Sequence, residues 1–283
     1  MKKRNIKIAV AKHSGFCSGV RRAYDLASVN SKECDDLYIL GKLVHNRDVC
    51  HDLKNKGIKE IESLENISEG TVIFTAHGVG PGLYNEASER GQKIIDTTCP
   101  KVMKAQRVSK SHSEKGREMI IFGDKKHEEV ISIFEWSNGK ARVIGSLEEV
   151  KKIKLNKKKK YCLIAQTTQN VDEFKKIQRH LAKKMPDFIF FNTICDSTDK
   201  RQKEIRKLAA CNDAVIIIGG KDSANSRRLF EIAKKINPKS YFIENAQELK
   251  LQWLVSVKSA LIGAGASTPK WVIEKVVDKV KSL

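Results

Sequence analysis

The sequence predicts an α/β protein built from three small αβ units with mainly parallel sheets. Short β-rich apolar runs, such as Ala214–Ile218, alternate with amphipathic helical stretches along the 283 residues. Three cysteines, Cys17, Cys99 and Cys195, divide the chain into near-thirds. We therefore expect three units about a pseudo-threefold axis, with one cysteine from each unit meeting there.

Each of these cysteines stands where a predicted strand gives way to a predicted helix. Cys17 lies between the predicted strand 6–11 and the predicted helix 20–29. Cys99 follows the predicted strand 93–95, and Pro100 directly after it opens a helix. Cys195 follows the predicted strand 188–191 and precedes a helix that starts at about 197. Free backbone N–H groups and the helix dipole favour a thiolate there. Such a position suits a metal ligand or a nucleophile.

The cysteine positions also set the predicted domain boundaries. The first unit is expected over 18–99, the second over 100–195, and the third over 196–283 together with 1–17. Polar, often glycine-containing loops follow the other predicted strands, at 41–46, 75–80, 123–129, 166–170, 219–226 and 263–269. Ligands collect outside the carboxyl ends of parallel strands, so these loops are expected to form the site.

The net charge of +20 comes from 54 lysines and arginines against 34 acidic residues. Such a charge permits binding of nucleic acid, of an anionic substrate or of an acidic partner protein. The densest run, 151–160, holds seven lysines. No aromatic RNA-binding motif, zinc finger or helix-turn-helix pattern accompanies this run, so we expect a solvated loop and no nucleic-acid partner.

Composition also predicts the compartment. The longest apolar runs are strand-sized and far shorter than a membrane span, so no membrane association is expected. The N-terminus, 1–5, is basic, but Lys7 and Lys12 interrupt the apolar residues after it, so no signal-peptide core forms. A cytoplasmic protein is expected, in which the seven cysteines stay reduced.

Three converging thiolates suggest a metal or cluster site with one open position. A four-iron cluster with three cysteine ligands would leave one iron free. Zinc with three cysteines and a water is the competing interpretation. No Cys-x-x-Cys pair occurs, and a single cysteine is more often a small buried hydrophobe than a ligand. That interpretation is applied to the other four, Cys34, Cys50, Cys162 and Cys211.

Three histidines, His45, His77 and His127, lie at predicted strand ends, where their rings could donate to a diphosphate. Ser223, Asn225 and Ser267 lie in loops whose hydroxyl, amide and N–H groups could cradle a phosphate. The sequence has no Walker A motif, and Gly263-Ala-Gly265 lacks the third glycine of a dinucleotide fingerprint.

Two adjacent carboxylates, Glu128 and Glu129, follow His127. Neighbouring residues cannot share one helical face, so at most one of the two should point into the site.

Taken together, these segments resemble the 4-hydroxy-3-methylbut-2-enyl diphosphate reductase family. The matching pieces are Gly15-Phe-Cys-Ser-Gly-Val-Arg-Arg-Ala23, Leu43-Val-His-Asn46, Ala76-His-Gly-Val79, Asp96-Thr-Thr-Cys-Pro100, His127-Glu-Glu-Val130, Gln166-Thr-Thr168, the turn 192–195, Ser223-Ala-Asn-Ser226 and Ala264-Gly-Ala-Ser267. They span nearly the whole chain in family order.

The resemblance implies a trefoil of three αβ domains around one [4Fe–4S] cluster held by Cys17, Cys99 and Cys195. It also implies reductive dehydroxylation of (E)-4-hydroxy-3-methylbut-2-enyl diphosphate to isopentenyl and dimethylallyl diphosphate, with a ferredoxin- or flavodoxin-type electron donor. Glu129 and Thr167 take the catalytic positions. The substrate-binding positions map onto His45, His77, His127, Thr168, Ser223, Asn225 and Ser267.

The chain departs from the family pattern around His127. The family commonly has Gly-His-Pro-Glu-Val-Glu-Gly, whereas this chain reads Lys126-His-Glu-Glu-Val-Ile-Ser132. Ala224 also stands where a second serine is common.

Two other functions are the alternatives to the reductase. They are a zinc- or iron-dependent hydrolase of a phosphorylated substrate and a basic nucleic-acid-binding protein. For Glu129 alone, the alternative role is a helix cap near Val130.

Overall fold

The computed structural model describes residues 6–185 and 187–282, and these form an α/β fold. Within them, three four-stranded sheets occur, and every strand pair is parallel. The predicted class, α/β with three small αβ units and parallel sheets, is confirmed. The arrangement of these units around a common axis stays a prediction.

The chain folds into two compact units. The terminal unit consists of Met1–Arg21, Val44–Lys56 and Asp196–Leu283, and the middle unit of Arg22–Leu43 and Gly57–Cys195. Each predicted domain range holds the strands of one sheet, but the ranges themselves stay a prediction. The basic stretch 1–5 lies outside the described residues.

The terminal unit contains one sheet with the strand order β1-β12-β10-β11. Its strands are β1 (Lys7–Val10), β10 (Ala214–Ile218), β11 (Ser240–Ile243) and β12 (Ser259–Ala264). Its helices are α2 (Arg47–Asn55), α8 (Asp196–Ala209), α9 (Ala224–Ile236) and α10 (Lys270–Lys281), with short 3-10 turns η2 (Ala246–Glu248) and η3 (Leu251–Leu254).

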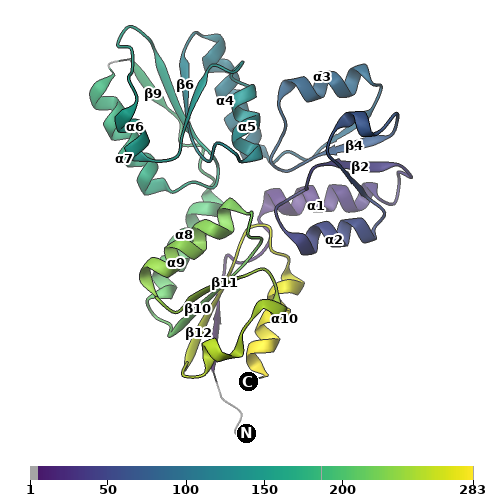
Figure 1. Ribbon diagram of the computed structural model, residues 1–283, viewed down its shortest axis with the longest axis vertical. Helices are drawn as coiled ribbons and strands as arrows, with labels where there is room; N and C mark the ends of the chain where they lie inside the picture. Colours follow the sequence, from purple (N-terminus) through teal and green to yellow (C-terminus); the bar gives the residue numbers. More distant parts are fainter. Residues whose placement is uncertain (1–5, 186, 283) are drawn as a thin grey trace. The chain divides into compact units, whose positions relative to one another are not determined.

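Alternation along β10 explains how helices cover both faces of this sheet. Val215 and Ile217 pack against α8 and α9, whereas Ile216 and Ile218 pack against α10. Figure 1 shows α8 and α9 on one side of the sheet and α10 on the other. Because both faces are covered, β10 reads as a continuous apolar run.

The first sheet of the middle unit has the order β3-β2-β4-β5. Its elements are β2 (Leu37–Leu40), β3 (Lys59–Ile61), η1 (Leu64–Asn66), β4 (Thr71–Phe74), α3 (Pro81–Glu89) and β5 (Lys93–Asp96). Val72 and Phe74 of β4 pack against Leu64 and Ala87, so η1 and α3 cover one face. Helix α1 (Ser18–Asn30) precedes this sheet, and the boundary between the compact units falls within it.

The second sheet of the middle unit has the order β7-β6-β8-β9. Its elements are α4 (Pro100–Glu114), β6 (Glu118–Phe122), α5 (Glu128–Glu135), β7 (Ala141–Ile144), α6 (Leu147–Lys152), β8 (Tyr161–Ala165), α7 (Val171–Lys184) and β9 (Phe188–Phe190). Ile120 and Phe122 face α6 and α7, while Met119 and Ile121 face α4 and α5. Figure 1 shows these helix pairs on opposite faces.

Local sequence fixes where several helices begin. Asn46, Ser146, Asn170 and Ser223 each accept a backbone N–H with their side chain at the first turn of α2, α6, α7 and α9. In the lysine run, Lys151 and Lys152 end α6, where cations favour the helix dipole. The run's remaining lysines lie in an exposed loop before β8, as predicted.

Candidate active site

The three cysteines of the predicted metal site all end a strand-to-helix connection, as the sequence predicts. Cys99 occupies the N-cap position of α4, with Pro100 as the first helical residue. Cys17 directly precedes α1, and Cys195 directly precedes α8. All three are partly exposed, and none forms a disulfide. Their role as ligands stays a prediction.

The backbone around each cysteine is held in the same way. Each cysteine N–H donates to a carbonyl in the loop that follows the neighbouring strand of its own sheet. The pairs are Cys17 with Ala266 at 3.1 Å, Cys99 with Ala76 at 3.1 Å, and Cys195 with Thr167 at 2.9 Å. Thr167 is itself a candidate site residue, and Ala266 and Ala76 directly precede the candidates Ser267 and His77. Each cysteine N–H is therefore hydrogen-bonded to a loop that carries a candidate site residue.

The chemistry of these thiols fits a metal or cluster ligand. The Cys17 sulfur accepts a hydrogen bond from the Val20 N–H at 3.4 Å, inside the first turn of α1. Metal ions bind the thiolate form of cysteine. At Cys162 in β8 that form is disfavoured, because burial raises the pKa of its thiol to about 12.

The other four cysteines do not all match the prediction of small buried hydrophobes. Cys162 is fully buried, as predicted, and Cys34 and Cys50 are half-buried. The prediction is wrong for Cys211, which is exposed. Cys211 lies just beyond the end of α8, where the chain turns toward β10 and solvent reaches the side chain.

Glu129 and Thr167 form a buried pair at the carboxyl end of the second sheet. The Thr167 N–H donates to Glu129 Oε1 at 2.6 Å, and the Thr167 hydroxyl donates to Oε2 at 2.8 Å. Glu129 is only 2% exposed. The carboxyl group is therefore held in one orientation next to a hydroxyl that can relay a proton.

Burial raises the pKa of the Glu129 carboxyl above its ordinary value, because a charge is poorly solvated there. The two hydrogen bonds from Thr167 and the nearby His77 act in the opposite direction but are smaller effects. A carboxyl with a raised pKa keeps its proton closer to neutral pH, as a general acid must.

His127, not Glu129, caps α5. The His127 Nδ1 accepts the Glu129 N–H at 3.2 Å. Glu129 is therefore not the N-cap residue, although its carboxylate lies in the first turn of α5. Because Nδ1 accepts, the neutral ring carries its proton on Nε2, where it can be donated to a ligand oxygen. His127 is buried, and its ring lies 5.4 Å from that of His77, centroid to centroid.

The loop that carries His77 is anchored on α5 and α4. Ser132 donates its hydroxyl to the His77 carbonyl at 3.5 Å, and Trp136 donates its indole N–H to the Val79 carbonyl at 2.9 Å. Gly78 adopts φ of +75°, and a Cβ there would lie 2.4 Å from the Gln106 amide nitrogen. The loop thus requires glycine directly after the candidate histidine.

In the terminal unit, Ser223 and Asn225 lie at the start of α9. Ser223 accepts the Ser226 N–H and is the N-cap. Asn225 is 5% exposed, and neither of its amide atoms has a hydrogen-bond partner among the described residues. A buried amide without partners is costly, so this one indicates a ligand-binding position.

His45 and Ser267 meet in the same unit, where His45 directly precedes the Asn46 N-cap of α2. The Ser267 hydroxyl donates to the His45 carbonyl at 3.4 Å. Gly220 packs on the same carbonyl, since a Cβ at that glycine would lie 2.2 Å from the His45 oxygen. The start of α2 therefore contacts both the loop after β10 and the loop after β12.

Gly220→Ala is expected to destabilise the protein by about 1–3 kcal/mol, because the added methyl must displace backbone atoms. Thermal unfolding of the purified variant measures the effect. Gly82→Ala is the matched control: it lies in α3 with nothing within 4 Å of the added Cβ. That substitution should stabilise the protein by about 0.5–1 kcal/mol. Equal unfolding temperatures for Gly220→Ala and the wild type would contradict the close packing on His45.

Sequence analysis missed one residue that organises this region, Glu244. This carboxylate is 5% exposed and follows β11 directly. It accepts the Lys221 N–H at 3.0 Å and lies 3.4 Å from the Arg47 guanidinium. It therefore joins the loop after β10 to the start of α2. Only the fold brings these segments together, so the sequence pattern contains no signal for it.

The candidate residues are divided between the two units. The terminal unit holds Cys17, His45, Ser223, Asn225 and Ser267, and the middle unit holds Cys99, Cys195, His77, His127, Glu129, Thr167 and Thr168. Thr168 is half-buried, and its hydroxyl has no hydrogen-bond partner within the described ranges. Their common role stays a prediction.

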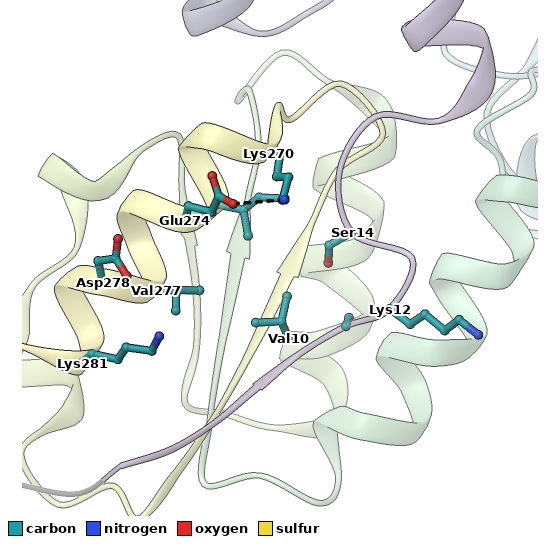
Figure 2. Close-up of a pocket in the computed structure, with 10 residues that line it drawn as sticks. Val10, Lys12, Ser14, Lys270, Glu274, Val277, Asp278 and Lys281 are labelled. Atoms are coloured by element: carbon teal, nitrogen blue, oxygen red, sulfur yellow. Dashed lines mark ion pairs between the residues drawn. The ribbon is translucent and has the colours of Figure 1, made fainter.

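A separate groove of about 750 Å³ lies between the edge strand β1 and α10. Its lining includes Val10, Lys12, Ile273, Val277 and Lys281. Figure 2 shows Glu274 paired with Lys270 along its rim, at 3.3 Å. No candidate site residue lines this groove, so it is not the predicted site.

Over residues 6–185 and 187–282, no helix is both long enough and apolar enough to cross a membrane.

Comparison with known proteins gives one consistent result. Residues 8–281 match the family model described as LytB protein. The chain is 39% identical to 4-hydroxy-3-methylbut-2-enyl diphosphate reductase of Geobacter metallireducens, over 98% of each chain. It is 38% identical to the enzyme of the same name from Clostridioides difficile, over 98% of this chain and all of that one.

Two solved structures are also similar. The E-1-hydroxy-2-methyl-but-2-enyl-4-diphosphate reductase of Plasmodium falciparum matches with a TM-score of 0.92 and 27% identity, over 97% of this chain and 87% of that one. A structure of (E)-4-hydroxy-3-methyl-but-2-enyl diphosphate reductase matches with a TM-score of 0.71 and 38% identity, over 98% and 100%. The hydrolase alternative has no support among these relatives. The match over nearly the full length places the chain in the LytB family.

Proposed function

We propose that Cys17, Cys99 and Cys195 hold one [4Fe–4S] cluster and that the surrounding polar residues bind an allylic diphosphate. The chain is an oxidoreductase of the non-mevalonate isoprenoid pathway. It converts (E)-4-hydroxy-3-methylbut-2-enyl diphosphate to isopentenyl and dimethylallyl diphosphate. The reaction consumes two electrons and two protons, and the substrate hydroxyl leaves as water.

One observation supports the residue assignment most directly. In each of the three sheets, the candidate cysteine donates its N–H to a loop that carries a candidate substrate residue or lies beside one. A substrate held by these loops would therefore lie close to the cysteine of the same sheet. When bound, the cluster supplies the electrons for the reduction.

The diphosphate is assigned to His45, His77, His127, Thr168, Ser223, Asn225 and Ser267. Two features support this assignment. The His127 Nδ1 is engaged by the Glu129 N–H, which leaves Nε2–H as the donor. Asn225 presents a buried amide without a protein partner at the N-terminus of α9, where the helix dipole favours an anion.

The transfer of a proton to the departing oxygen is assigned to Glu129 and Thr167. Water leaves an allylic carbon far more easily than hydroxide, so the departing oxygen needs a proton. Burial raises the pKa of the Glu129 carboxyl, which favours its protonated form, and the hydroxyl of Thr167 is hydrogen-bonded to it. Thr167 can therefore relay the proton from Glu129 to the substrate oxygen.

The test is to purify the protein without oxygen and record its absorption spectrum, with assays of iron and sulfide. A brown protein with broad absorption near about 400 nm and iron and sulfide in equal amounts is expected for a cluster with cysteine ligands. A colourless protein that contains zinc would contradict the cluster and favour a three-cysteine zinc site.

The electron donor is expected to be an acidic protein of the ferredoxin or flavodoxin type, because the chain carries a net charge of +20. Turnover with such a donor should fall between roughly 50 and 300 mM salt, since the Debye length is only about 10 Å at 0.1 M. Turnover with a small dye reductant should fall less. Equal salt dependence for both donors would contradict charge-guided docking. We also propose a cytoplasmic location, where the seven cysteines remain reduced.

A further inference from the structure

Glu128 and Glu129 turn their carboxylates toward different sheets. Glu129 is buried against Thr167, at the end of the second sheet of the middle unit. Glu128 is exposed at the first turn of α5, and its Oε2 lies 2.8 Å from Nδ1 of His77, in the loop after β4 of the other sheet. Adjacent residues of one helix thus contact two separate candidate loops.

The His77 ring is more enclosed than its partner. The His77 side chain is 14% exposed and the Glu128 side chain 45%. One edge of the ring faces Glu128, and the His127 ring meets it at an interplanar angle of 88°. The His77 backbone is fixed separately, since the Gly78 N–H donates to the Thr75 carbonyl at 3.0 Å and Ser132 donates to the His77 carbonyl. Glu128 is therefore well placed to orient the ring itself.

The hydrogen-bond donors and acceptors around the His77 ring indicate a function for this contact. The Glu128 carboxylate lies at ion-pair distance, 2.8 Å, from Nδ1, and because a carboxylate accepts hydrogen bonds only, it can pair with this nitrogen only when Nδ1 carries a proton. A phosphate oxygen at the opposite nitrogen, Nε2, also accepts only. The ring can serve both partners only as an imidazolium, with a proton on each nitrogen.

We propose that Glu128 is a positioning residue that holds the His77 ring by Nδ1, so that Nε2–H is donated to a diphosphate oxygen of the substrate. The inference rests on the proposed function, which assigns His77 to the diphosphate. Glu128 acts through His77 and makes no contact with the reacting atoms. A carboxylate near the diphosphate also repels it, so the contact is favourable only because the imidazolium lies between the two anions.

The direct test is Glu128→Gln, which keeps the size of the side chain but removes its charge. Binding of inorganic pyrophosphate to the anaerobic holoenzyme should weaken about fivefold, the upper range for a partly exposed ion pair. In turnover, KM should rise by a similar factor while kcat changes little. Glu148→Gln is the matched control, because Glu148 is also an exposed acid in the first turn of a helix, α6. Its pyrophosphate affinity should equal that of the wild type.

A double-mutant cycle separates action through His77 from a general effect of charge. In a His77→Asn background, the further change Glu128→Gln should leave pyrophosphate affinity unchanged, because the ring that Glu128 orients is gone. Equal or tighter binding by Glu128→Gln alone, or a fivefold loss that persists without His77, would overturn the proposal. If the wild-type holoenzyme does not bind pyrophosphate, the diphosphate assignment of the proposed function fails, and this inference fails with it.

Discussion

Cys99→Ser is expected to lower the bound iron and sulfide of the anaerobically purified protein more than about 10-fold, and to abolish turnover. Loss of even an outer-shell partner commonly costs about 10- to 100-fold in metal affinity. Loss of a ligand should cost more, because a site with three protein ligands has no spare one. Cys17→Ser and Cys195→Ser should behave in the same way. Iron and sulfide assays with the absorption spectrum measure the effect.

The matched control is Cys211→Ser, the same atomic change at an exposed cysteine beyond the end of α8. Its iron content and turnover should equal those of the wild type. Cys162 is a poorer control, since it is fully buried in β8, and a serine there would bury a hydroxyl. Full iron content and activity in Cys99→Ser would show that the three-thiolate assignment is wrong.

The sheets could be predicted from the sequence because strands buried on both faces must be continuous apolar runs. Ala214–Ile218 is fully buried along its length, and the sequence shows it as an uninterrupted apolar run. The strand-to-helix position of Cys99 could be predicted for a similar local reason. Within a helix, proline is tolerated only in the first turn, so Pro100 marks the start of α4.

Exposure at the ends of elements was harder to predict. Cys211 has an apolar neighbourhood in sequence, and yet it is exposed, because it follows the last turn of α8.

The compact unit to which a helix belongs was also hard to predict. Helix α2 belongs to the terminal unit, although it lies within the predicted range 18–99. Both outcomes depend on packing between distant segments, which a local pattern does not contain.

The two adjacent glutamates show where sequence reasoning about the candidate site stops. Helical geometry predicts that Glu128 and Glu129 face different directions, and they do. It does not say which one is buried. That depends on the loop after β8, which places the N–H and hydroxyl of Thr167 opposite Glu129. The contact of Glu128 with His77 joins two sheets and has no sequence signal either.

Glu129→Gln is expected to lower kcat by roughly 10²-fold or more, because an amide cannot donate the proton that the departing oxygen needs. The shape of the site should survive. The amide oxygen can accept the Thr167 N–H, and the amide nitrogen can donate to the Thr167 hydroxyl, in place of the two carboxylate oxygens. Cluster content and pyrophosphate affinity should therefore stay near the wild-type values. Steady-state kinetics, iron assay and pyrophosphate binding measure the three quantities.

The pH dependence of kcat gives the same residue a second signature. Burial raises the pKa of Glu129, so the protonated form persists above the usual range of a carboxyl group. Turnover should fall as pH rises through that raised pKa, because the ionised form has no proton to give. Glu129→Gln should lose this alkaline limb along with most of its rate. Glu128→Gln is the control and should keep both kcat and the limb, with only a higher KM. If Glu128→Gln instead lost turnover while Glu129→Gln kept it, the proton donor would be the neighbouring residue.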